Sequence, residues 1–346
     1  MTSALDVSLH DTWAAEPPEW AEFVAGQRLP AIWDWSVIQA VTNARRSPVL
    51  AATVRDGQTV RGLVTARFVG ARVRSTAIPA TGMVDVDCLV SGSLPGIVLD
   101  GAAGPELFGE TVAALRDTLR RTYGRRVRAV LLRQVSAEAL PAVLRWPAIV
   151  REGGPIAVFR NRFTSFDDYL AGLSRDRRAS LRRVIRRLDA DPDLAVSFTG
   201  RGDPVEPLDV ADLLDLQART VDRHHRRWYL RRRVSHPAVT RAVLAQPTVH
   251  RLTYRDGTGR LLAYGTAWDH AERPILGAWG ALGLAEGGRK HQWFHHMAVY
   301  LRWCIETGRQ GLLSGQASIP EKVQLGHETH RQWAVLVPQG GRPRGR

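Results

Sequence analysis

Apolar and polar positions along the chain form blocks whose spacing predicts helices and strands. In the first half we expect a helix at 34–45, then two strands around Asp56-Gly57, a dipeptide typical of hairpin turns. Apolar residues at helical spacing predict a longer helix at 106–124, which ends at a glycine. The run at 126–132 predicts a strand. The first half therefore contains a hairpin, an irregular middle, a helix and a strand.

The second half shows a similar order of strands, helix and strand. Ser165 is a suitable N-cap, with two aspartates in the first turn of the helix that it begins. The expected helices are 165–173, 175–188, 209–225 and 291–308, and the expected strands are 194–198, a meander at 249–268 that turns at Asp256-Gly257, 274–282, 311–315 and 332–338. This coarse duplication predicts one domain at 1–160, a second at 161–338, and a disordered basic tail at 339–346.

The helix expected at 175–188 holds seven arginines in fourteen residues. One stripe of this helix is apolar, at Leu181, Val184, Ile185 and Leu188. Arg178, Arg182 and Arg186 follow each other along a flank. The pattern predicts a helix that packs on a core and turns guanidinium groups outward. Those groups either face solvent or bind phosphate, and the pattern alone leaves both open.

Composition changes this picture only slightly. The formal net charge of the 346 residues is +14, which favours anionic partners. Lysine occurs only at Lys290 and Lys322, so an arginine preference inflates every basic cluster. Two cysteines without C-x-x-C spacing argue against a disulfide framework or a thiolate metal site. We expect neither a signal peptide nor a membrane span, and hence a cytoplasmic protein.

A glycine-rich basic turn lies between the strand at 274–282 and the helix at 291–308. Backbone N–H groups at such a turn, together with the positive end of a helix dipole, suit a phosphate. We therefore expect a phosphate-bearing co-substrate at the segment that consists of Gly287, Gly288, Arg289 and Lys290. A plain surface turn is the alternative.

The last third of the chain has a recognisable succession of residues. The expected helix ends at Gly308, and the short strand after it ends at Gly315. A loop follows, and then a K…LG motif formed by Lys322, Leu325 and Gly326. This order resembles Fem-type peptidoglycan aminoacyltransferases and their GNAT-superfamily relatives, as does 166–188. The resemblance implies an α/β (α+β) chain with two tandem GNAT-like domains, each a mixed, mostly antiparallel sheet flanked by helices. His327 departs from the family's usual aromatic residue, and no coiled-coil arm is present.

The resemblance implies an N-acyltransferase that moves an acyl group from acyl-CoA to the amine of a small molecule or peptide. Lys322 would stabilise the oxyanion, and His327 would contact substrate. Asp85 and Asp87 alternate on one expected strand and would either orient the acceptor amine or face solvent. No permanently bound cofactor is expected. Alternatives are an aminoacyl-tRNA donor and a non-catalytic RNA-binding module.

Two further clusters contain residues that can bind ligands. Trp228 and Tyr229 lie within a basic-aromatic patch that could stack a base, or could simply pack at a helix end. His291 and His295 have a zinc-compatible i, i+4 spacing, but without H-E-x-x-H or a third ligand we expect no metal. The sequence contains no DNA-reading motif, Walker loop or G-x-S-x-G elbow.

Overall fold

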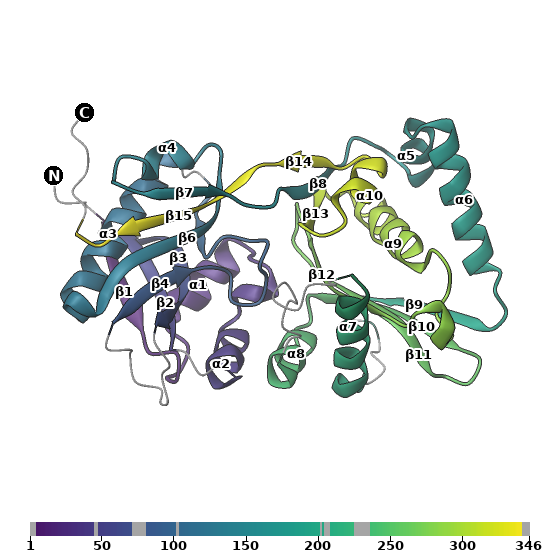
Figure 1. The fold of residues 1–346 in the computed structure, drawn as a ribbon, viewed down its shortest axis with the longest axis horizontal. Helices are drawn as coiled ribbons and strands as arrows, with labels where there is room; N and C mark the ends of the chain where they lie inside the picture. Colours follow the sequence, from purple (N-terminus) through teal and green to yellow (C-terminus); the bar gives the residue numbers. More distant parts are fainter. Residues whose placement is uncertain are drawn as a thin grey trace. The chain divides into compact units, whose positions relative to one another are not determined.

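The computed structural model describes residues 5–44, 48–70, 81–101, 104–200, 203, 208–224 and 236–340. The chain divides into two compact units. Unit 1 comprises Met1–Ile156 with His330–Arg346, and unit 2 comprises Ala157–Thr329. Each unit has its own mixed, mostly antiparallel sheet flanked by helices (Figure 1). This confirms the predicted α/β class.

Unit 1 is built on a sheet in the order β1-β2-β3-β4-β6-β15-β7, with β5 paired to β3. The strands are β1 (Leu5–His10), β2 (Val49–Asp56), β3 (Thr59–Gly70), β4 (Gly82–Val86), β5 (Ile97–Leu99), β6 (Val127–Ser136), β7 (Ile149–Glu152) and β15 (Gln332–Pro338). The helices are α1 (Pro18–Gly26), α2 (Trp35–Ala44), α3 (Pro105–Tyr123) and α4 (Leu140–Val143). As predicted, Asp56-Gly57 joins β2 to β3, and α3 buries Val112, Leu115 and Leu119 in the core.

The predicted second domain, 161–338, includes the last strand of the chain. The structure places this strand in unit 1 instead. β15 pairs with β6 and β7 and so belongs to the sheet of unit 1. Its Val335 and Val337 are fully buried in the core of that unit. An alternating apolar strand fits either sheet equally well, so its sequence could not decide between them.

Unit 2 has a sheet in the order β14-β8-β13-β12-β11-β10-β9. The strands are β8 (Ile156–Arg160), β9 (Leu194–Thr199), β10 (Val249–Asp256), β11 (Leu261–Trp268), β12 (Ile275–Ala281), β13 (Gly311–Gly315) and β14 (Glu328–His330). The helices are α5 (Phe166–Gly172), α6 (Arg175–Asp189), α7 (Val210–His224), α8 (Pro237–Leu244), α9 (Gln292–Glu306) and α10 (Ile319–Gln324).

The helices of unit 2 cover both faces of its sheet. Trp279 of β12 contacts α9 through His296, whereas a side chain at the next residue, Gly280, would meet the backbone of α7. Because successive strand residues point to opposite faces, α9 and α7 lie on opposite faces of the sheet. α5 and α6 pack against α9.

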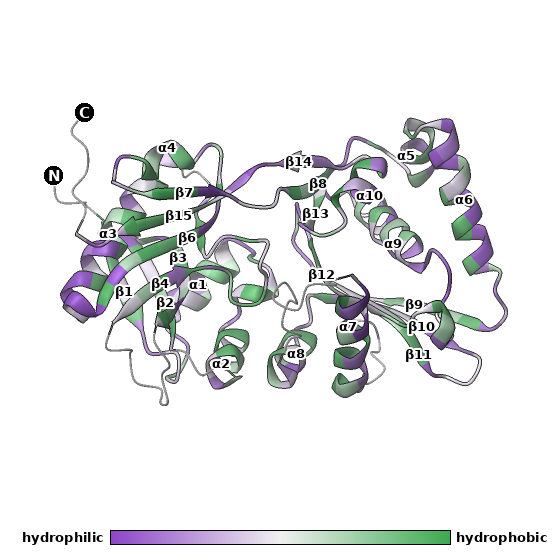
Figure 2. Ribbon diagram, in the orientation of Figure 1, coloured by the Kyte–Doolittle hydropathy of each residue, from purple (hydrophilic) through white to green (hydrophobic). Residues whose placement is uncertain are grey.

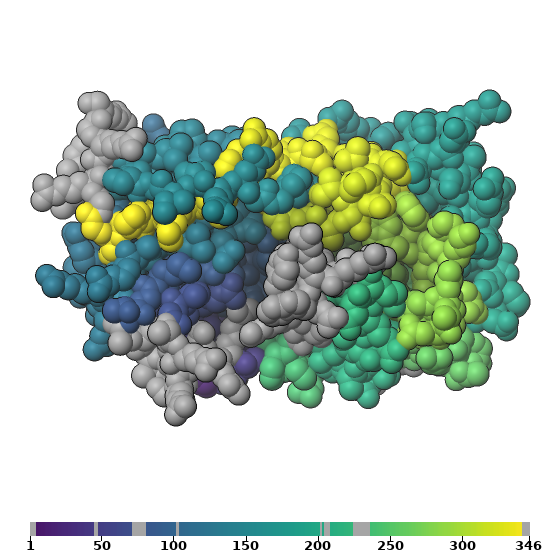
Figure 3. All heavy atoms as spheres, in the orientation of Figure 1, coloured from purple at the N-terminus to yellow at the C-terminus, as the bar shows by residue number. Residues whose placement is uncertain are grey.

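α6 is the arginine-rich helix, and its packing confirms the predicted stripe. Leu181, Val184, Ile185 and Leu188 are buried, and hydrophilic residues predominate along the helix (Figure 2). Atoms of α6, in teal, are at the surface in the space-filling view (Figure 3). α6 is thus a scaffold helix with a basic outer surface.

Candidate active site

Strands β12 and β13 part inside the sheet of unit 2. They are parallel neighbours, and the register of these two described strands consists of the single pair Ile275↔Leu313. In unit 1 the corresponding parallel pair, β4 and β6, stays together from Gly82↔Val127 to Val86↔Leu132. Both pairs enclose a helix, so they occupy matching places in the two units. The parting of β12 and β13 leaves backbone groups inside the sheet without their usual neighbour strand.

The side-chain exposure of β12 shows that this parting is accessible. β11 is buried throughout, whereas Leu276–Trp279 of β12 are partly exposed. A central strand covered by helices on both faces is ordinarily buried. The exposed residues therefore mark an opening beside β12, which we call the β12–β13 opening.

An irregularity in β12 lies at the same point. Its pairing with β11 shifts between Gly265↔Trp279 and Ala267↔Leu276, which inserts one extra residue into β12. The Thr266 hydroxyl accepts the Ala278 N–H at 2.9 Å. A Cβ on Gly277 would lie 2.3 Å from that hydroxyl oxygen, so the bulge requires a glycine there. Bulges of this kind redirect backbone groups and are frequent beside active sites.

Lys322 lies where the two strands part. It comes from the short helix α10 and is only 4% exposed. Its Nζ donates a hydrogen bond to the carbonyl oxygen of Ser314, the residue after the last β12–β13 pair. A buried ammonium in a site with little water exerts a much stronger field than a surface lysine.

His327 holds the Lys322 segment in place. Its Nδ1 lies 3.0 Å from the Lys322 carbonyl oxygen, which can only accept, so Nδ1 carries the proton. Its Nε2 then accepts a hydrogen bond from the Ser314 hydroxyl at 2.8 Å. Burial, and secondly the Lys322 ammonium, lower the pKa of His327 to about 4. His327 is therefore neutral near pH 7.

His296 approaches the same region from α9. It packs on Trp279 with ring centroids 4.4 Å apart and is 3% exposed. Burial, and then the Lys322 ammonium, lower the pKa of His296 to about 3. Lys322, His296, Ser314 and His327 form what we call the lysine–histidine cluster. Because both imidazoles are neutral, Lys322 supplies the positive charge of this cluster.

Asp85 and Asp87 lie in unit 1, and both are bound to arginines. Asp85 is 2% exposed and forms ion pairs with Arg133, at 2.6 Å, and Arg67, at 3.1 Å. Arg67 also reaches Asp87 at 2.8 Å. Two carboxylates and two guanidinium groups balance each other in charge. This pairing accounts for their burial and differs from the expected solvated or amine-binding carboxylates.

The glycine-rich turn does not offer the amides that we expected. The Gly287 N–H donates to the Leu284 carbonyl at 3.2 Å, and the Gly288 N–H donates to the Gly283 carbonyl at 2.9 Å. Both positions of this turn require glycine. Gly287 adopts φ +95, and a Cβ on Gly288 would lie 2.3 Å from the Leu282 carbonyl oxygen. Gly287 and Gly288 therefore allow the turn to adopt this conformation, and their amides bond within the turn.

The basic residues of the turn divide into a paired and an exposed group. Arg289 forms an ion pair with Asp191 at 2.8 Å. Lys290 is exposed, directly before His291, the N-cap of α9, which makes no side-chain capping bond. A phosphate near this turn would therefore meet the exposed Lys290 side chain rather than the amides of the two glycines.

Arg178 lies in the first turn of α6 and Arg182 at its centre. Arg178 donates to the Ala171 carbonyl at 2.9 Å, and Arg182 pairs with Asp167 at 3.6 Å, so both contact the α5 segment. Arg187, at the far end of the arginine face expected near the phosphates, donates to the Lys290 carbonyl. The C-terminal end of α6 therefore contacts the turn.

The other expected site residues contribute less. Trp228 and Tyr229 lie outside the described residues. His295 bonds with Tyr254 and Asp189. Within the described ranges, no group of three or more His, Cys, Asp or Glu residues could hold a metal ion. Ser314, His296 and Trp279 were missed, since each is an ordinary residue of a predicted element and only the parting of the strands brings them together.

Comparisons with known proteins establish the fold. No family model and no curated protein matches the chain. The structure of L-PGS from Bacillus licheniformis aligns over 94% of this chain and 92% of its own, with 10% identity and a TM-score of 0.59. The C-terminal domain of a putative lysylphosphatidylglycerol synthetase from Agrobacterium fabrum covers 92% and 90%, with 12% identity and a TM-score of 0.55.

FemX gives a similar result. Its crystal structure aligns over 86% of this chain and 89% of its own, with 11% identity and a TM-score of 0.56. The chain therefore has the two-domain, GNAT-like fold of Fem-type proteins, as predicted. Among the described residues, no helix is both long and apolar enough to cross a bilayer.

Proposed function

We propose that the chain is an N-acyltransferase that transfers an acyl group from acyl-CoA to an amine. The observation that carries this proposal is a buried ammonium, Lys322, at the point where β12 and β13 part. The fold shared with FemX and with lysylphosphatidylglycerol synthetases supports a group-transfer reaction.

The reaction follows from the charge at this place. The amine nitrogen attacks the thioester carbonyl carbon, and the carbonyl electrons move to the oxygen. The Lys322 ammonium stabilises that oxyanion through its positive charge. The intermediate then collapses, the C–S bond breaks, and the proton lost by the amine leaves with the thiol. The products are an amide and free CoA.

The β12–β13 opening supports an extended donor. Unpaired backbone groups along an open strand edge can bind the amides of a chain laid beside them. The pantetheine part of CoA is such a chain. Its phosphates would be near Lys290 at the N-terminal end of α9, where Arg187 adds positive charge.

One observation favours an aminoacyl-tRNA donor instead. Arg183 and Arg186 are exposed on α6 and have no carboxylate partner in the described part of the chain. Such a surface suits a nucleic-acid backbone. A non-catalytic RNA-binding module would use the same surface, with steeply salt-dependent affinity and no turnover.

The test compares Lys322→Met with Arg120→Met, which removes an exposed charge in unit 1. Both variants are assayed for amide formation from acyl-CoA and from aminoacyl-tRNA over an amine panel. We expect Lys322→Met to lower kcat by roughly 10²- to 10³-fold, the usual effect of removing an oxyanion partner. Arg120→Met should match the wild type. Circular dichroism checks that both variants are folded.

Two outcomes would contradict the proposal. If Lys322→Met turned over at the wild-type rate, the ammonium would have no catalytic role. If neither donor gave product with any amine, the transferase function itself would be wrong. Turnover with aminoacyl-tRNA alone would replace the acyl-CoA donor by the alternative.

A further inference from the structure

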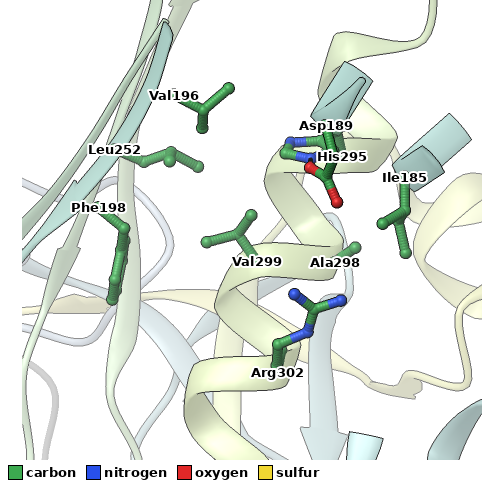
Figure 4. A pocket seen from close by; sticks show the side chains of 9 residues that line it. All are labelled: Ile185, Asp189, Val196, Phe198, Leu252, His295, Ala298, Val299 and Arg302. Atoms are coloured by element: carbon green, nitrogen blue, oxygen red, sulfur yellow. Dashed lines mark hydrogen bonds and ion pairs between the residues drawn. The ribbon is translucent and has the colours of Figure 1, made fainter. Parts of the chain in front are cut away.

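A pocket of about 190 Å³ lies within unit 2, between the helices α6 and α9 and the strands β9 and β10. Figure 4 shows Val196, Phe198 and Leu252 of the strands facing α9 across this pocket. None of the residues that line it belongs to the lysine–histidine cluster. It is therefore a separate feature of the fold, and we call it the α6–α9 pocket.

The walls of the α6–α9 pocket are apolar. Val196, Phe198, Leu252 and Val299 line it together with Ile185 and Ala298. A cavity of about 150 Å³ with such walls can hold a benzene ring. The α6–α9 pocket can therefore accept a branched aliphatic or aromatic group. Water in it finds few polar partners, so an apolar group that displaces this water gains affinity.

Two opposite charges stand at the helical side of the pocket. Arg302 of α9 lies over the Phe166 ring at 4.6 Å and has no ion pair with any described carboxylate. Asp189 of α6 is half-exposed. Figure 4 shows the guanidinium group and the carboxylate on the helical side of the pocket, opposite the apolar strand residues.

The orientation of the Asp189 carboxylate is fixed by buried hydrogen bonds. Its Oδ1 accepts from His295 Nε2 at 2.9 Å, and His295 Nδ1 in turn accepts the Tyr254 hydroxyl at 2.9 Å. Burial lowers the pKa of His295 and raises the pKa of Tyr254, which agrees with a neutral imidazole and a protonated phenol. The second carboxylate oxygen, Oδ2, has no partner in the described part of the chain and can accept from a ligand.

We propose that the α6–α9 pocket binds a free α-amino acid with an apolar side chain. The side chain occupies the apolar walls, the α-carboxylate pairs with Arg302, and the α-ammonium donates to Asp189 Oδ2. A monocarboxylate of the same shape would pair with Arg302 but meet the negative charge of Asp189. A simple amine would meet the positive charge of Arg302. Only a zwitterion satisfies both groups. This site goes beyond the proposed transferase, whose chemistry depends on Lys322.

The test uses the full chain and measures binding by isothermal titration calorimetry. L-Leucine is compared with 4-methylpentanoate, which lacks the ammonium group, and with L-leucinamide, which lacks the carboxylate. We expect L-leucine to bind at least about tenfold more tightly than either analogue, as loss of one charge-assisted hydrogen bond implies. L-Phenylalanine tests whether the walls admit an aromatic ring.

Variants assign the binding to this pocket. Arg302→Met and Asp189→Asn should each weaken L-leucine binding by at least about tenfold. Asparagine can still accept from His295, so the fold of the pocket is retained. Arg241→Met removes an exposed arginine of α8 and should leave binding unchanged.

Three results would overturn the proposal: no binding of either amino acid to the wild type, equal affinity for L-leucine and either analogue, or unaltered binding in both pocket variants. The comparison of analogues on the wild type needs no variant to fold. Lys322→Met should retain L-leucine binding, so failure of this proposal and failure of the proposed function are distinguishable.

Discussion

Acidification tests the buried histidines of the lysine–histidine cluster. His296 has a pKa of about 3 in the folded chain, far below the value near 6.5 of an unfolded histidine. As the pH falls below 6.5, the unfolded chain takes up a proton at this residue and the folded chain does not. Stability that is fully present above pH 6.5 is therefore lost progressively as the pH falls towards 3.

The size of this loss follows from the pKa difference. Each pH unit between the two pKa values costs about 1.4 kcal/mol, so His296 removes roughly 2 to 3 kcal/mol from the free energy of unfolding between about pH 6.5 and pH 4.5. His327, with a pKa of about 4, removes a similar amount over the same interval. The two together could cost about 5 kcal/mol, a large part of the stability of an ordinary domain.

The measurement is urea unfolding followed by circular dichroism at a series of pH values. His296→Gln keeps a polar side chain of similar size but cannot titrate. We expect this variant to lose about 2 to 3 kcal/mol less than the wild type on acidification. His236→Asn, at the exposed N-cap of α8, keeps a capping group and should follow the wild type. Equal acid sensitivity of His296→Gln and wild type would refute the reasoning.

Three further substitutions, two of them with a matched control variant, test the packing of both units. Leu181→Ala empties a buried position of α6 and should cost about 2 to 5 kcal/mol, whereas Arg183→Ala on the exposed face should change stability by less than about 0.5 kcal/mol in urea titrations. Gly288→Ala places a Cβ 2.3 Å from the Leu282 carbonyl oxygen and should cost about 1 to 3 kcal/mol by thermal unfolding; an unchanged Tm would contradict the close approach. Asp85→Ala removes the carboxylate that pairs with Arg133, while Arg67 keeps Asp87, and should cost about 2 to 4 kcal/mol; Asp117→Ala, which removes an exposed carboxylate, should be near neutral.

Local pattern determined much of the secondary structure. The apolar residues of the stripe from Leu181 to Leu188 are buried, as their helical spacing predicts. The Ser165 side chain accepts the Asp168 N–H as the N-cap, and the hairpins turn at Asp56-Gly57 and at Asp256-Gly257. These features depend on neighbouring residues alone, because turn geometry, capping and helix period act over a few positions.

Long-range pairing was decided only by the tertiary structure. The strand at 332–338 satisfies either sheet by its own alternation, and it joins unit 1 because β6 and β7 offer it two partner edges. In the same way Asp85 looks like a solvated carboxylate until β3 and β6 bring two arginines beside it. Such choices depend on residues far apart in the chain.

The candidate site shows the same division. The sequence alone identified Lys322 and His327 as candidate site residues. Lysine is rare in this protein, and the glycines around Lys322 follow the order found in Fem-type proteins. The parting of β12 from β13, the approach of His296 and the closure of the turn upon its own glycines arise from packing between segments. Sequence by itself therefore determined which elements form and which lysine to examine. Only the folded chain decided what surrounds that lysine, because burial and the field of a charge depend on neighbours that the sequence keeps apart.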